Sequence, residues 1–144
     1  ILVGLVGSEM CIRDSNKFRT LILDLTFNQN YFERMIHHEI FHMIDNSFPE
    51  LFKKNQWSEL NNKDFSYASC STCTDLLGLD LEVKKGFLTE YSMSTAEEDM
   101  AEIYSLLKTN FKEIDLLIKK DNILTKKKNF LIKGLKEIDE KFIF

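Results

Sequence analysis

All three histidines of this 144-residue chain fall within six consecutive positions, and two of them form the pattern His38-Glu39-x-x-His42. On a helix, side chains four residues apart project from the same face, so His38 and His42 could hold one Zn²⁺ together. Glu39 would then lie beside the metal, where a carboxylate can take a proton from a water molecule. The alternative is a structural helix whose two histidines are partly buried and hydrogen-bonded. The pattern favours a hydrolytic zinc site.

Two histidines do not complete such a site. Zinc in hydrolytic sites commonly takes three protein ligands and a water molecule, so a third group is needed. The remaining histidine, His37, lies far round the helix from the pair and is not a ligand candidate. The chain also lacks the downstream His-x-x-Gly-x-x-His extension, which excludes a three-histidine site. The third ligand must be a carboxylate or a cysteine, and a carboxylate from a later helix is the common solution.

Residues 31–46 have the periodicity of a helix that could present the two histidines. Asn30 followed by Glu33 has the form of a capping box, and Pro49 ends the pattern. Apolar side chains recur at spacings of three and four, which predicts a stripe that packs on a core: Phe32, Met35, Ile36, Ile40, Met43 and Ile44. We expect the two histidines at one edge of this stripe.

A second helix is expected after Ser94, to about residue 108, because Ser94 and Glu97 have the spacing of a capping box and apolar residues continue the pattern. With Glu97 assigned to the cap, Glu98 and Glu102 remain, four residues apart on one face. Two carboxylates one turn apart repel each other unless a cation or hydrogen-bond donors compensate them, so a metal would account for the pair. The alternative is a solvated acidic face near a helix N-terminus, where acidic residues are favoured in any case.

The other segments complete a predominantly helical α+β domain. Residues 18–27 are apolar and rich in β-formers, which predicts a strand and hence a small sheet. Residues 48–85 break into short, irregular pieces that could wall a cleft, with Trp57 as a packing anchor. Residues 111–144 have the pattern of two helices, on which the lysines at 126–128 are expected to form a solvated face.

Length and composition limit the number of domains and the kinds of partner. A chain of 144 residues with 44% hydrophobic content suffices for one globular domain. A net charge of -4 and the lack of a basic cluster with interleaved aromatics argue against nucleic acid as the main partner. No run reaches the roughly 18 apolar residues of a membrane span. The sequence does not indicate an oligomeric state.

The beginning of the chain is a poor guide to the fold. Residues 5–15 look like the translated end of a transposon adapter used in DNA library preparation. We therefore expect residues 1–15 to be non-native and residues 16–144 to form a single domain that is truncated at its N-terminus.

Cys70 and Cys73 form a C-x-x-C motif. Such a motif can be half of a zinc site, a redox pair, a local disulfide or two unrelated thiols. No second C-x-x-C or spare histidine is present to complete a structural zinc site. We expect a loop without a catalytic role.

Residues 88–104 are similar to the third-ligand region of the anthrax lethal factor-like gluzincin metallopeptidases, a group that includes the Pro-Pro endopeptidases. That family has a tyrosine seven residues before the ligand glutamate, which begins a Glu-x-x-Ala-Glu motif on a helix. Tyr91, Glu98 and Ala101-Glu102 match these positions. The similarity runs from about residue 30 to residue 107 and implies a zincin-like domain, with the His-Glu-x-x-His motif on one helix and the third ligand on another.

The resemblance implies a role for each matching residue. His38, His42 and Glu98 would bind one Zn²⁺ per chain. Glu39 would act as the general base on a zinc-activated water and then protonate the leaving amine. Tyr91 would donate a hydrogen bond to the oxyanion of the tetrahedral intermediate. The expected activity is that of a zinc metalloendopeptidase with a peptide or protein substrate.

The resemblance also implies two supporting residues and a location. Glu102, and Asp45, which follows His42 by three residues as in the family, would accept hydrogen bonds from the ligand histidines. Relatives commonly act outside the cell or at its surface. We expect the same location here, with the export signal lost together with the native N-terminus.

Two other interpretations remain open. A non-catalytic, zinc-stabilised binding domain would keep His38, His42 and Glu98 but would not need Glu39, so the presence of Glu39 favours the enzyme. Truncation could also leave this fragment inactive although its full-length parent is active.

Overall fold

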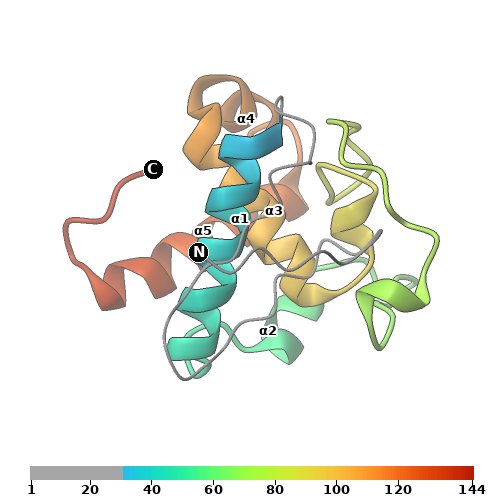
Figure 1. Ribbon diagram of the computed structural model, residues 1–144, viewed down its shortest axis with the longest axis horizontal. Helices are drawn as coiled ribbons and strands as arrows, with labels where there is room; N and C mark the ends of the chain where they lie inside the picture. Colours follow the sequence, from blue (N-terminus) through green and yellow to red (C-terminus); the bar gives the residue numbers. More distant parts are fainter. Residues whose placement is uncertain (1–30) are drawn as a thin grey trace, which may run out of the picture.

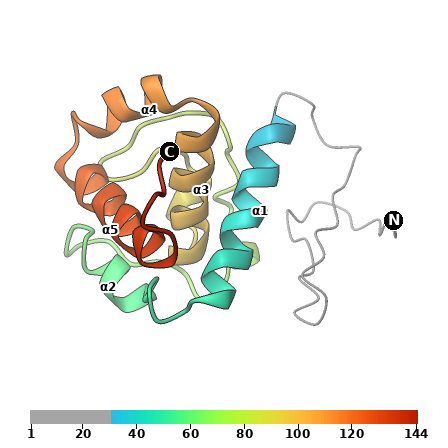
Figure 2. The same ribbon diagram turned by 90° about the vertical axis from the view of Figure 1, so that its left-hand side faces the viewer.

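The computed structural model describes residues 31–144, in which α-helices carry the fold. The central helix is α3, which has α1 on one side and α5 on the other, while α4 joins α3 to α5 (Figure 1, Figure 2). The described elements in chain order are α1 (Phe32–Ser47), α2 (Lys54–Ser58), the 3-10 turns η2 (Ser71–Cys73) and η3 (Tyr91–Met93), α3 (Ala96–Thr109), α4 (Phe111–Ile118) and α5 (Asn122–Ile138).

Neighbouring elements cover α3 on almost all sides. Its apolar residues share one core with Phe41 of α1 and Leu131 of α5. The same helix carries three buried acidic residues, Glu98, Asp99 and Glu102. A buried carboxylate is tolerated only when a counter-charge or several donors lie against it. The acidic residues of α3 therefore mark the places where the fold must supply partners.

α3 begins one residue later than predicted. Thr95, rather than Ser94, caps the helix, and its side-chain oxygen accepts a hydrogen bond from the backbone N–H of Glu98 at 3.3 Å. Glu98 therefore occupies the position that the prediction gave to Glu97, while Glu97 forms an ion pair with Lys54 near the surface. The cap thus fixes the backbone of Glu98 in the first turn of α3.

α1 spans the predicted residues to within one position, but the predicted buried stripe is wrong. Of its six apolar residues only Met35 is buried, and the other five are half-buried. The buried face instead carries Met35, His38, Glu39, Phe41 and Asp45. Polar residues turn inward because α1 packs against α3, whose carboxylates provide partners for them. The predicted capping residue Asn30 lies outside the described residues.

The predicted small sheet is wrong. Residues 31–144 contain no strand, only an isolated antiparallel bridge between Lys84 and Phe87. Gly86 makes the turn between them at φ +89°, a left-handed conformation that glycine adopts readily. Turns and side-chain hydrogen bonds hold the long connection between α2 and α3. A pair of strands would have needed a continuous series of backbone hydrogen bonds between them. The strand predicted at 18–27 and the segment 1–15 lie outside the described residues.

The lysines at 126–128 do not form one solvated face. Lys127 is completely buried, with Nζ 2.6 Å from Asp99 Oδ2. The same ammonium donates to the carbonyl of Gly86 at 2.7 Å and lies 3.8 Å from the ring centroid of Phe87. A desolvated ammonium over an aromatic face is stabilised by the ring quadrupole. The ion pair therefore ties α5 to α3 and to the turn at Gly86.

Replacing Lys127 by methionine is expected to destabilise the protein by about 3–5 kcal/mol, the usual effect of removing one partner of a buried ion pair. Asp99 would keep only the hydrogen bonds from Trp57 Nε1 at 2.8 Å and the Tyr67 hydroxyl at 2.5 Å. Lys126→Met is the matched control, because Lys126 is exposed on the same helix and its loss should change stability by less than about 0.5 kcal/mol. Urea unfolding followed by circular dichroism measures both variants, and equal midpoints would contradict the structural role of Lys127.

Candidate metal centre

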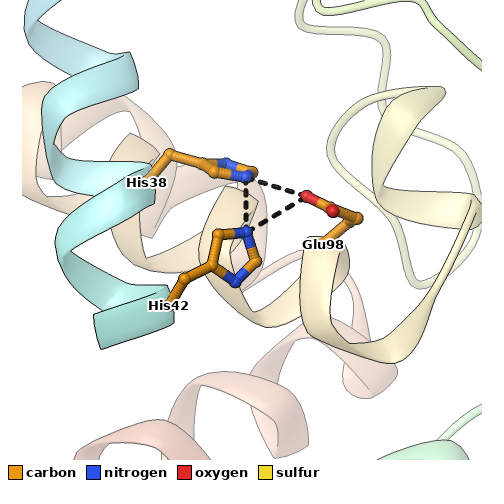
Figure 3. A group of neighbouring side chains, drawn as sticks. All are labelled: His38, His42 and Glu98. Atoms are coloured by element: carbon orange, nitrogen blue, oxygen red, sulfur yellow. Dashed lines mark hydrogen bonds and ion pairs between the residues drawn. The ribbon is translucent and has the colours of Figure 1, made fainter. Parts of the chain in front are cut away.

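His38 and His42 project from one face of α1 towards Glu98 in the first turn of α3 (Figure 3). His38 Nε2 and His42 Nε2 lie 2.9 and 3.3 Å from Glu98 Oε2, and the two nitrogens are 3.1 Å apart. Ligand atoms bound tetrahedrally to one Zn²⁺ at the usual bond lengths are about 3.3–3.5 Å from one another. The triangle has nearly the size of one face of such a tetrahedron, so these three residues could hold a metal ion.

With a neutral His38 ring, the three atoms do not satisfy one another as hydrogen-bonding groups. His38 Nδ1 lies 3.0 Å from Glu102 Oε1, and because an ionised carboxylate only accepts, Nδ1 carries a hydrogen. In the neutral ring, Nε2 of His38 is then an acceptor that faces another acceptor, Glu98 Oε2. A cation bound between these atoms would accept their lone pairs. Two imidazole nitrogens and a carboxylate oxygen are also a known ligand set of catalytic zinc.

The charges around His38 favour a positive charge at this point. Burial lowers the pKa of His38, but hydrogen bonds to Glu102 and Glu98 outweigh burial and raise the pKa to about 10. Burial raises the pKa of Glu98, and hydrogen bonds from His38 and His42 outweigh it and hold the pKa well below its usual range. A second proton on His38 can supply the positive charge, and a bound metal ion would take the place of that proton.

Solvent reaches the group from the side of His42. The His42 side chain is 22% exposed, whereas that of Glu98 is 12% and that of His38 only 2% exposed. Catalytic zinc sites keep one coordination position open to water or substrate, while structural sites are closed by a fourth protein ligand. In the described part of the chain, three residues could hold a metal ion here. Three protein ligands would leave the fourth coordination position free, as in catalytic zinc sites.

Glu102 holds His38 from the side opposite to Glu98. Besides the contact with His38 Nδ1, its carboxylate accepts a hydrogen bond from the Thr89 hydroxyl at 2.7 Å and forms an ion pair with Arg34 of α1. A carboxylate in this position fixes the tautomer and the ring orientation of a metal-binding histidine. Glu102 makes the contact with His38 that its expected role requires, and the role itself stays a prediction. Sequence reasoning missed Arg34 and Thr89, although Arg34 lies four residues before His38 and so shares its helix face.

The other residues expected at the site lie near the group without belonging to it. Glu39 is buried on α1 directly after His38, and Tyr91 is buried at the start of η3. The Tyr91 and His38 rings have their centroids 6.1 Å apart. Asp45 is buried one turn after His42; burial raises the pKa of Asp45, while the charges of Lys54 and His42 act to lower it. The expected hydrogen bond from a ligand histidine to Asp45 stays a prediction.

Cys70 and Cys73 form a disulfide across η2. Of the four alternatives open for this motif, the structure has the local disulfide. A cysteine engaged in a disulfide offers no thiolate to a metal, so these two cysteines do not compete with Glu98 as the third ligand.

One family model matches nearly the whole chain. It covers residues 5–144 and is described as "Putative zinc-binding metallo-peptidase". The match begins inside the segment 1–15 that we expected to be non-native. No curated protein and no solved structure matches the chain.

Proposed function

Because the chain belongs to this family of zinc-binding metallopeptidases, we propose that it is a zinc metalloendopeptidase of the gluzincin type that cleaves peptides or proteins. The observation that supports the proposal best is the convergence of two imidazoles from α1 and one carboxylate from α3 on a single point. In a gluzincin the third protein ligand is a glutamate on a later helix, and Glu98 has this position.

His38, His42 and Glu98 would hold the ion. When bound, zinc lowers the pKa of a coordinated water towards about 7 and polarises the substrate carbonyl. Glu39 is proposed to take the proton of the attacking water on its carboxylate and to give it to the leaving amine nitrogen. Its place directly after His38, on a buried face of α1, supports this role.

Tyr91 is proposed to donate its phenolic hydrogen to the oxyanion. The backbone of Tyr91 is held in place, since its N–H donates to the carbonyl of Gly78 at 2.9 Å and its carbonyl accepts from the Ser94 hydroxyl at 2.7 Å. Tyr91→Phe is therefore expected to lower kcat by about 10²–10³-fold, the effect of losing one oxyanion donor. The zinc content should not change. Steady-state kinetics with a fluorogenic peptide measures kcat, and an unchanged kcat would remove Tyr91 from the mechanism.

The proposal is tested by zinc analysis and peptide cleavage on the purified chain. We expect one zinc per chain and cleavage of some members of a broad peptide library, with cleavage lost after chelation and recovered when zinc is added back. Bound zinc without cleavage of any peptide would favour a zinc-stabilised binding domain. Absence of bound zinc would contradict both functions.

We propose that the protein acts outside the cytosol. The disulfide between Cys70 and Cys73 supports this location, because disulfides persist in oxidising compartments. Among the helices of residues 31–144, none has the length and apolar character needed to cross a membrane. Fractionation of cells that produce the protein tests this location, and a protein found only in the cytosol would contradict it.

A further inference from the structure

Arg34 connects the metal centre to the segment that precedes η3. Its Nη1 donates to the carbonyl of Leu79 at 2.6 Å, and its Nη2 pairs with Glu102 Oε2. The side chains of Arg34 and Glu102 are only 11% and 2% exposed, so solvent and salt screen this pair little. One guanidinium thereby joins α1, α3 and the connection between α2 and α3.

Thr89 holds the same carboxylate oxygen from another direction. Its hydroxyl accepts a hydrogen bond from the backbone N–H of Ser92 at 3.1 Å and donates its own hydrogen to Glu102 Oε2 at 2.7 Å. The carbonyl of Thr89 also accepts from the Ser92 hydroxyl at 2.7 Å, and the Thr89 residue is fully buried. The direction of the Thr89 hydroxyl is therefore set by its own loop.

The two donors leave Glu102 a single orientation. Oε2 is taken by Arg34 and Thr89, so Oε1 remains for His38 Nδ1, 3.0 Å away. A carboxylate without partners on one oxygen can rotate about its terminal bond, and the histidine bonded to the other oxygen can then rotate with it. A ring fixed at Nδ1 presents Nε2 in one direction only.

We infer that Arg34 and Thr89 are positioning residues, which fix Glu102 and through it orient the His38 ring for metal binding. The inference rests on the proposed function, since it assumes that His38 binds zinc. The partner of a metal-binding histidine, here Glu102, typically contributes 10- to 100-fold to metal affinity or activity. Arg34 and Thr89 act through Glu102, and we expect the loss of either to cost an amount within this range.

Thr89→Val and Thr89→Ser form the first test. Valine has nearly the shape of threonine but lacks the hydroxyl, whereas serine keeps it. We expect Thr89→Val to raise the zinc dissociation constant about tenfold, and Thr89→Ser to stay close to the wild type. Competition with a chromophoric chelator measures the dissociation constant for Zn²⁺ alone. The visible absorption spectrum of the Co²⁺ form should change in Thr89→Val and recover in Thr89→Ser.

Arg34→Met forms the second test, with an expected loss of zinc affinity of about 10- to 100-fold, and Arg34→Lys should recover part of it. Lys128→Met is the matched control. Lys128 and Asp115 form a partly buried ion pair between α5 and α4, with side chains 17% and 11% exposed, against 11% and 2% for Arg34 and Glu102. Its loss should lower stability without changing zinc affinity or the Co²⁺ spectrum.

Folded Thr89→Val and Arg34→Met variants with wild-type zinc affinity and an unchanged Co²⁺ spectrum would overturn the inference. An equal loss of affinity in Lys128→Met would overturn it as well, because the effect would then follow from stability alone. If Arg34→Met does not fold, the zinc affinities of Thr89→Val, Thr89→Ser and Arg34→Lys test the inference instead. Failure of the proposed function would give a different result, because the wild type itself would then bind no zinc or cleave no peptide.

Discussion

Replacing Glu39 by glutamine is expected to reduce kcat for peptide cleavage by about 10²–10⁴-fold, the contribution of a positioned general acid–base group. Glutamine has the shape of glutamate and can still form hydrogen bonds, but its amide does not take up a proton at neutral pH. Since Glu39 lies outside the group of His38, His42 and Glu98, the bound zinc should stay at one per chain. Single-turnover cleavage and zinc analysis of the same preparation measure the two effects separately.

Glu33→Gln is the control for this substitution, because Glu33 is an exposed glutamate on the same helix. Its activity should equal that of the wild type. Equal activity in Glu39→Gln and the wild type would refute Glu39 as the base. A Glu39→Gln variant that loses zinc as well as activity would instead assign Glu39 to the support of the metal.

The part of the site that sequence predicts best is the part set by local geometry. Four-residue spacing places His38 and His42 on one face of any helix, whatever surrounds it. Glu98 was predicted to be the third ligand from a family resemblance, and the structure brings its Oε2 to within 3.3 Å of Nε2 of both His38 and His42. Glu102 followed for the same reason, one turn further along α3. Spacing places the members of each pair on one face of one helix, whereas the approach of α1 to α3, which brings Glu98 to the histidines, depends on tertiary packing.

The contacts that sequence did not predict join distant segments. Arg34 reaches Glu102, 68 residues away, and Thr89 reaches it from a loop, so neither has a local pattern. Lys127 was expected in solvent because lysine is rarely buried without a partner, and its partner Asp99 lies on another helix.

The wrong stripe on α1 has a related cause. Apolar periodicity predicts which face would be buried against an apolar neighbour. The neighbour of α1 is the acidic face of α3, so the face that carries His38 and Asp45 is buried instead.

Replacing Glu98 by alanine is expected to weaken zinc binding by more than about 100-fold, the upper range for the loss of an outer partner, because it removes a direct ligand. Activity should fall to background. Zinc that binds the folded state at 100 times its dissociation constant stabilises the fold by about 2.7 kcal/mol, so Glu98→Ala should also lose the rise in melting temperature that zinc gives the wild type. Isothermal titration calorimetry and thermal unfolding with and without zinc measure these effects.

Glu97→Ala is a close control, since Glu97 precedes Glu98 in the first turn of α3 but pairs with Lys54 near the surface. It should bind zinc like the wild type, and any helix effect common to both substitutions cancels in the comparison. If Glu98→Ala keeps the zinc affinity of the wild type, another acidic residue must complete the ligand set. Glu102 is excluded from that role, because its Oε1 faces His38 Nδ1 and its Oε2 faces Arg34. The proposed gluzincin site therefore depends on Glu98 alone among the acidic residues of α3.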